Sequence, residues 1–80
     1  MLITKVQLDS IDKVKRFVNQ VSCLDCELDL VSGRYVVDAK SIMGIFSIDL
    51  SQPIELRIHD GTEKPEHVVD LLKDYIVTDE

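Results

Sequence analysis

The side chains most capable of chemistry in this 80-residue sequence are its two cysteines and two histidines. Cys23 and Cys26 form a C-x-x-C string, which in thioredoxin-type sites opens a helix after a strand. Here the pair follows a predicted helix and precedes a predicted strand. A structural zinc site needs four ligands, and the sequence has no second cysteine pair. We therefore expect two thiols without a special role, with redox or metal chemistry as the alternative.

The histidines are His59 and His67. His59 ends a predicted strand on its polar side, and His67 lies in the first turns of the last predicted helix, so we expect both on the surface. No nucleophile and base stand at a recognisable spacing, and no glycine-rich string could hold a phosphate. The sequence thus predicts a protein that is not an enzyme and that binds no metal or cofactor.

Alternating apolar and polar residues predict the strands of the fold. This pattern occurs in four segments: 2–8, 27–30, 34–39 and 54–59. Gly33 lies between the second and third segments and tolerates the positive φ of a tight turn, so these two segments are predicted to form a hairpin. In the first segment, Val6 and Leu8 share the apolar face.

Helical periodicity predicts two longer helices. The first follows the N-cap residues Asp9 and Ser10, and its apolar side consists of Ile11, Val14, Phe17, Val18 and Val21. The second begins at Pro65, and its apolar side consists of Val68, Leu71, Leu72, Tyr75 and Ile76. Because both helices are apolar on one side only, we expect an α+β fold over residues 1–80. One face of an antiparallel sheet is then covered by helices, and the other faces water.

The short segment 40–48 carries two separate apolar sides. Ser41 is a predicted N-cap. On a helical wheel, Ile45 and Ile48 fall on one side, and the other side consists of Ile42, Met43 and Phe46. A short helix on a one-layer sheet buries one side fully, which leaves Ile42, Met43 and Phe46 as an exposed patch suited to a protein partner. The alternative is that both sides belong to the core.

The charge balance excludes several partners. Nine basic residues stand against fifteen acidic ones, for a net charge of −6, and no basic stripe is visible. Direct binding of nucleic acid or of an anionic membrane is therefore not expected. No apolar run approaches the ~20 residues that span a bilayer. Without an export signal at the start, we expect a cytoplasmic protein.

The segment 40–44, Lys-Ser-Ile-Met-Gly, is followed by Ser47 and resembles part of the histidine-containing phosphocarrier (HPr) family of the bacterial sugar phosphotransferase system. The spacing to Gly33 and to Asp60–Gly61 also fits this family. The resemblance implies an open-faced β-sandwich with the order βαββαβα. It has a four-stranded antiparallel sheet with three helices on one face.

The family carries phosphate on a histidine at the start of the first helix, within a G-I-H-A-R-P-like string. In this sequence Ser10 lies about where that histidine is expected, with Asp12 near the arginine position and Lys13 near the proline. A phosphoserine ester transfers its group far less readily than a phosphoimidazole. The resemblance therefore points to a variant that lacks the phosphoacceptor and phosphocarrier activity. The alternative is a genuine phosphocarrier that uses a non-standard residue.

In some bacteria the family is phosphorylated by a kinase at a serine that corresponds to Ser41. The modified protein then binds a regulator in carbon catabolite repression. The resemblance implies Ser41 as phosphoacceptor and Ile42, Met43 and Phe46 as the contact patch. Expected partners are a kinase, a transcriptional regulator or a transport enzyme, and the protein is expected to be a monomer or a weak homodimer. The alternatives are that Ser41 only caps a helix, or that this is a small interaction domain unrelated to sugar transport.

Overall fold

The computed structural model describes residues 1–61 and 64–77. Its strands form one sheet in the order β1-β4-β2-β3, in which every neighbouring pair is antiparallel. The strand bounds are β1 (Leu2–Val6), β2 (Leu28–Ser32), β3 (Tyr35–Asp38) and β4 (Ile54–Ile58). The four predicted strand segments are thereby confirmed, with ends that differ by at most two residues.

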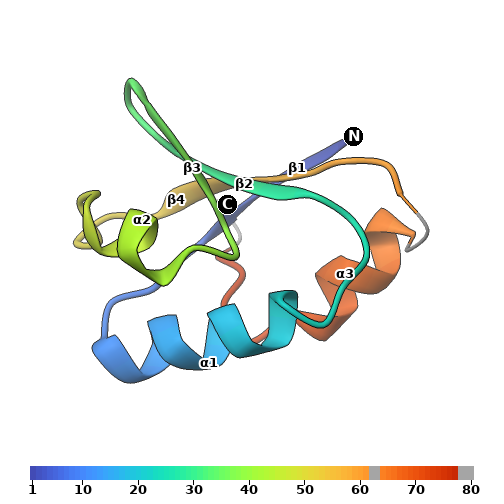
Figure 1. Ribbon diagram of the computed structural model, residues 1–80, viewed down its shortest axis with the longest axis horizontal. Helices are drawn as coiled ribbons and strands as arrows, with labels where there is room; N and C mark the ends of the chain where they lie inside the picture. The colour runs from blue at the N-terminus through green and yellow to red at the C-terminus, as the bar shows by residue number, and fades with distance from the viewer. Residues whose placement is uncertain (62–63, 78–80) are drawn as a thin grey trace.

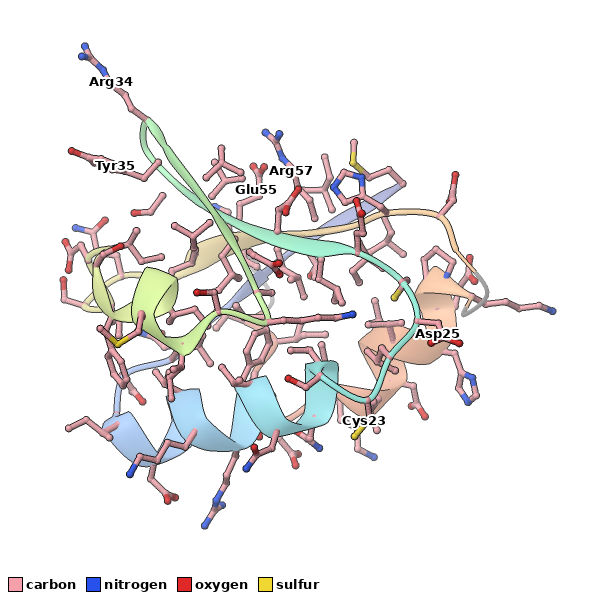
Figure 2. The ribbon with its side chains drawn as sticks, viewed as in Figure 1. Cys23, Asp25, Arg34, Tyr35, Glu55 and Arg57 are labelled. Atoms are coloured by element: carbon pink, nitrogen blue, oxygen red, sulfur yellow. The ribbon has the colours of Figure 1, made fainter. Side chains whose placement is uncertain are left out.

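The side chains of β4 show how the sheet separates its two faces. Ile54, Leu56 and Ile58 are buried against the helices, because alternate side chains of a strand point to the same side. Glu55 and Arg57 point to the other side, where Arg57 Nε donates a hydrogen bond to Glu55 Oε2 at 2.6 Å. Figure 2 shows both above the sheet, on the side that no helix covers. The predicted open-faced arrangement is confirmed.

Three helices lie on the other side of this sheet (Figure 1). Their bounds are α1 (Ile11–Val21), α2 (Ile42–Phe46) and α3 (Pro65–Leu71). The element order is therefore βαββαβα, as the resemblance implied. Within the described residues, no helix is long and apolar enough to cross a membrane.

The apolar side of α1 is buried, except at its first residue. Val14, Phe17 and Val21 are fully buried, whereas Ile11 is 64% exposed. The prediction that Ile11 belongs to the buried side was therefore wrong. Side chains of an α-helix point toward its N-terminus, so the side chain of the first residue projects past the helix end and lacks the neighbours that cover later turns.

The last predicted helix is shorter than its apolar pattern. α3 ends at Leu71, which is 45% exposed and not buried as predicted. Because only seven residues are helical, α3 itself contributes Val68 to the core. Leu72 is buried just after the helix. The chain then leaves the helical path. Ile76 pairs with Val6 as an antiparallel bridge at the edge of β1.

Candidate functional site

Ser41 stands at the start of α2 as an exposed N-cap. Its Oγ accepts a hydrogen bond from the backbone N–H of Gly44 at 3.2 Å, and its carbonyl accepts one from Ile45 at 3.0 Å. These bonds satisfy backbone donors that the first turn would otherwise leave unpaired. The predicted cap at Ser41 is confirmed, and the exposed hydroxyl group remains open to solvent on its outer side.

Gly44 sets how closely α2 approaches β3. A Cβ at this position would lie 3.3 Å from Ser41 Oγ and 3.3 Å from Val37 Cβ. Both distances are shorter than ordinary van der Waals contact, so any side chain here would press on the serine and on the strand. Glycine therefore allows α2 to pack on β3 without crowding the Ser41 hydroxyl.

The two apolar sides predicted for α2 have different surroundings. Ile45 and Ile48 are buried in the core. Met43 is 78% exposed and Phe46 is 41% exposed, whereas Ile42 is half-buried and packs against the core. We call Ile42, Met43 and Phe46 the α2 patch. Its exposed part is mainly Met43 and Phe46, so the alternative that both sides are core is wrong for these two residues.

α2 lies over the N-terminal half of α1, and the two helices are in contact (Figure 1). The first residue of α1, Ile11, is itself an exposed apolar side chain. The helix pair therefore presents apolar surface from both of its members. Sequence reasoning missed Ile11 because its spacing is that of the buried side of α1.

The start of α1 is a polar, ion-paired site. Ser10 Oγ accepts a hydrogen bond from the backbone N–H of Lys13 at 3.1 Å, which confirms the predicted N-cap. Lys13 Nζ also lies 3.2 Å from Asp9 Oδ1, and Arg16 Nε lies 3.0 Å from Asp12 Oδ2. The two carboxylates that flank Ser10 are therefore balanced by cations one helical turn further on.

Neither histidine lies at the start of α1. His59 directly follows β4, and His67 lies in α3. Figure 1 shows the end of β4 and the beginning of α3 at the opposite end of the molecule from the start of α1. The serine at that position therefore has no imidazole near it within the described residues.

The two histidines have different environments. His59 Nε2 lies 2.7 Å from Asp29 Oδ2 on the neighbouring strand, and both side chains are about one-third exposed. His59 therefore lies at the surface, as expected, and the contact of its ring with the cross-strand carboxylate was not predicted. His67 is exposed, as predicted, and lines a shallow hollow of about 210 Å³ with Leu24, Val68 and Leu71.

The two thiols are free and differ in exposure. Cys23 is exposed, and its Sγ donates a hydrogen bond to the Asn19 carbonyl at 3.5 Å. Cys26 is 1% exposed and belongs to the core. Figure 2 shows Cys23 at the outer side of the loop that follows α1. Within residues 1–61 and 64–77, no group of three histidine, cysteine or acidic side chains is placed to hold a metal ion.

A polar hollow of about 380 Å³ lies beside the β2–β3 pair and was not anticipated from the sequence. It is lined by Glu27, Leu28, Asp29, Asp38 and Lys40. Lys40 Nζ donates a hydrogen bond to the Leu24 carbonyl at 2.7 Å, so this lysine ties the segment before α2 to the loop after α1. No local pattern could predict this contact, since it joins residues that are sixteen positions apart.

This architecture is similar to that of known HPr proteins. No family model and no curated protein sequence matches the chain. Among solved structures, the crystal structure of HPr-C-His from Thermoanaerobacter tengcongensis matches with a TM-score of 0.76 and 25% sequence identity. The match covers 92% of this chain and 89% of that chain. The chain therefore has an HPr-like fold.

Proposed function

We propose that this protein is an HPr-like regulatory or protein-binding module of a bacterial cytoplasm that does not act as a phosphocarrier. The proposal rests on the residue at the start of α1, which is a serine and not a histidine. Ser10 caps this helix, and both histidines lie at the other end of the molecule. The fold match supports the family resemblance, and Ser10 supports the loss of carrier chemistry.

The chemistry of a carrier explains why this residue matters. A carrier must accept a phosphoryl group and release it to the next protein, which a ring nitrogen of histidine permits because the phosphoimidazole bond is labile. A serine phosphate is a stable ester. The hydroxyl of Ser10 could hold a phosphoryl group but would not pass it on at a useful rate.

The carrier test uses the general phosphotransferase enzyme with phosphoenolpyruvate. We expect no acid-labile phosphorylated form of this chain, while a histidine-bearing HPr in the same reaction is phosphorylated. His59→Ala and His67→Ala variants serve as controls, because any residual labelling that survives both changes is not on histidine. Acid-labile labelling at the rate of the HPr control would show a genuine phosphocarrier and refute the proposal.

The regulatory part of the proposal rests on Ser41 and the α2 patch. Phosphorylation of Ser41 adds about −1.5 to −2 charge beside exposed apolar side chains. Ser41 is exposed and its Oγ already faces the backbone N–H of Gly44, so phosphate oxygens at this position have a donor to accept from. A partner that recognises phosphate next to Met43 and Phe46 would bind only the protein phosphorylated at Ser41.

Treatment with HPr kinase and ATP, followed by mass spectrometry, tests this step. We expect one phosphate on the wild-type chain and none on Ser41→Ala. Ser47→Ala is the matched control, because Ser47 is an exposed serine at the other end of the same helix, where its Oγ donates to the Gly44 carbonyl at 2.6 Å. Modification that survives Ser41→Ala contradicts the assignment of Ser41.

The partner surface is tested separately from the modification. We propose that a kinase, a transcriptional regulator or a transport enzyme binds at the α2 patch. Met43→Asp places a charge at its most exposed position and is expected to abolish binding of such a partner. Ile3→Asp is the matched control, since Ile3 is 53% exposed in β1, away from α2. Binding that survives Met43→Asp would place the partner elsewhere.

A further inference from the structure

The outer edge of β3 has unpaired backbone groups. β3 is the last strand of the sheet and pairs only with β2 among the described residues. The backbone N–H of Ala39 donates to the Leu28 carbonyl at 2.9 Å. In an antiparallel pair, hydrogen-bonded positions alternate, so Val37 and Tyr35 also bond to β2. Val36 therefore directs its N–H and C=O away from the sheet, toward the free edge.

β3 is short, but its edge lacks several of the other features that protect edge strands from pairing. Natural edge strands are commonly blocked by lysine, proline or a covering loop. β3 contains neither lysine nor proline, and its Tyr35 and Val36 are 68% and 58% exposed. Figure 2 shows Arg34 and Tyr35 at the tip of the β2–β3 hairpin, pointing away from the body of the molecule. The edge is open to another strand.

The residues along this edge are complementary to themselves. The segment 34–38, which we call the β3 edge, reads Arg-Tyr-Val-Val-Asp, with a cation at one end and an anion at the other. A second copy that pairs antiparallel about a two-fold axis at Val36 places Val36 opposite Val36. Tyr35 then faces Val37, and Arg34 faces Asp38. Both ends of the pairing therefore join opposite charges, which is favourable across a strand pair. Each contact also occurs twice, once on either side of the two-fold axis, as an isologous interface requires.

The hydrogen-bonding pattern and the side chains fit the same register. The outward N–H and C=O of Val36 are the groups that a central pair exchanges across a two-fold axis. Val31 of β2 lies directly opposite Val36 on the open face. The pairing would therefore place Val31, Val36 and their two symmetry mates side by side in one apolar row.

The charge of Asp38 gives an independent reason for a cation at this edge. Asp38 lies directly opposite Asp29 across the β2–β3 pair, where like charges are destabilising. Asp29 is paired with His59, whereas the Asp38 carboxylate accepts, from the described residues, only the backbone N–H of Lys40, at 2.9 Å. Among the described residues, Arg34 makes no ion pair within its own chain. The guanidinium of a second copy would supply the missing positive charge to Asp38.

We propose that two copies of this chain associate through their β3 edges, so that two four-stranded sheets become one continuous antiparallel sheet. The contact is short, and small interfaces of this kind form weak and transient complexes. We expect a dissociation constant on the order of 10⁻⁴ M. The α2 patch is not required for this association, so the proposal is independent of the proposed partner binding.

The first test exchanges the charges. Arg34→Asp makes both ends of the edge acidic, and Asp38→Arg makes both ends basic. Each variant alone is expected to lose self-association at least tenfold in sedimentation equilibrium, because like charges then face each other. An equimolar mixture restores both ion pairs and is expected to form a heterodimer near the wild-type strength. If both variants are folded by circular dichroism and the mixture stays monomeric, the proposed register is wrong.

The second test does not depend on Asp38, whose carboxylate also holds the following turn. Val36→Lys places two ammonium groups together at the two-fold axis and is expected to give a monomer. Ile3→Lys is the matched control, because Ile3 is a similarly exposed aliphatic residue on the opposite edge strand, and it is expected to leave the dimer intact. A wild-type chain that remains monomeric at about 1 mM, well above the expected dissociation constant, overturns the proposal. So does association that is lost with Ile3→Lys or Met43→Asp but kept with Val36→Lys.

Discussion

The ring of Tyr75 meets the ring of Phe17 edge-on, with centroids 5.5 Å apart and planes at 87°. This contact joins the segment after α3 to the buried side of α1. Such T-shaped pairs contribute roughly 0.5–1.5 kcal/mol beyond their burial. Burial raises the pKa of Tyr75 above the usual value of 10.0, because the phenolate form would lose its hydration in this position.

We therefore expect the protein to lose stability in alkaline solution. The unfolded chain releases the Tyr75 proton near pH 10, before the folded chain does, so the stability due to the neutral phenol is intact below that pH. It declines as the pH rises toward the higher pKa of the folded state. Thermal unfolding between pH 8 and 11 measures this decline, and Tyr75→Phe should reduce it. In a Tyr35→Phe background, Tyr75 is the remaining tyrosine, and its absorbance titration should lie above pH 10.

Both N-cap serines should contribute measurably to stability. Ser10→Ala and Ser41→Ala each remove a side-chain acceptor from a backbone N–H, and we expect each to cost about 1 kcal/mol of unfolding free energy. Ser41→Asp keeps an acceptor at the cap and should lose less. Urea denaturation measures all three. Ser22→Ala, an exposed serine that closes α1 without a side-chain cap bond, is the control, and equal losses at Ser22 and Ser10 would argue against capping.

The two sides of α2 should respond very differently to truncation. Ile45 is fully buried, so Ile45→Ala is expected to cost about 2–5 kcal/mol. Met43 is 78% exposed, and Met43→Ala should change stability by less than about 0.5 kcal/mol. Denaturant unfolding of the pair compares neighbouring positions of one helix. A large loss at Met43 would mean that the α2 patch is part of the core.

The two thiols should react at very different rates. Cys23 is exposed and should react with a thiol reagent in the folded protein within seconds to minutes, whereas Cys26 should react only when the chain opens. The backbone at Gly61 packs tightly against Cys26, since a Cβ added at Gly61 would lie only 3.0 Å from the Cys26 Cβ. Stopped-flow titration counts the fast thiols, and Cys23→Ser should leave none. Two equally fast thiols would contradict the burial of Cys26.

Local periodicity was sufficient to predict most of the elements. The segment from Ile11 to Val21 is helical at both predicted ends, because Ser10 is a strong cap and the apolar spacing is regular. The hairpin at Gly33 also forms as predicted, since its φ of +60° suits glycine and few other residues. A short helix buries only one of its sides against the sheet, so Ile45 is buried while Met43 on the other side is exposed.

Features that depend on neighbours in space could not be predicted. Ile11 and Leu71 have core-like spacing, but each stands at the end of a helix, where no other described element covers it fully. The contact of His59 with Asp29 depends on the register of β2 and β4, which no single strand pattern reveals. The outward direction of the Val36 backbone likewise depends on which side of β3 its partner strand occupies.

The bridge between Val6 and Ile76 affects when β1 can complete its pairing during folding. The backbone N–H of Gln7 donates to the Tyr75 carbonyl at 2.8 Å, and that of Val77 donates to the Lys5 carbonyl at 2.9 Å. The segment of β1 is therefore hydrogen-bonded to residues 75–77. β1 also pairs with β4, whose residues lie 48 to 56 positions later in the sequence than their partners. β1 therefore cannot complete its hydrogen bonds until β4 and residues 75–77 have also been synthesised. Such long-range pairing slows folding, because the chain must close a long loop before these contacts can form.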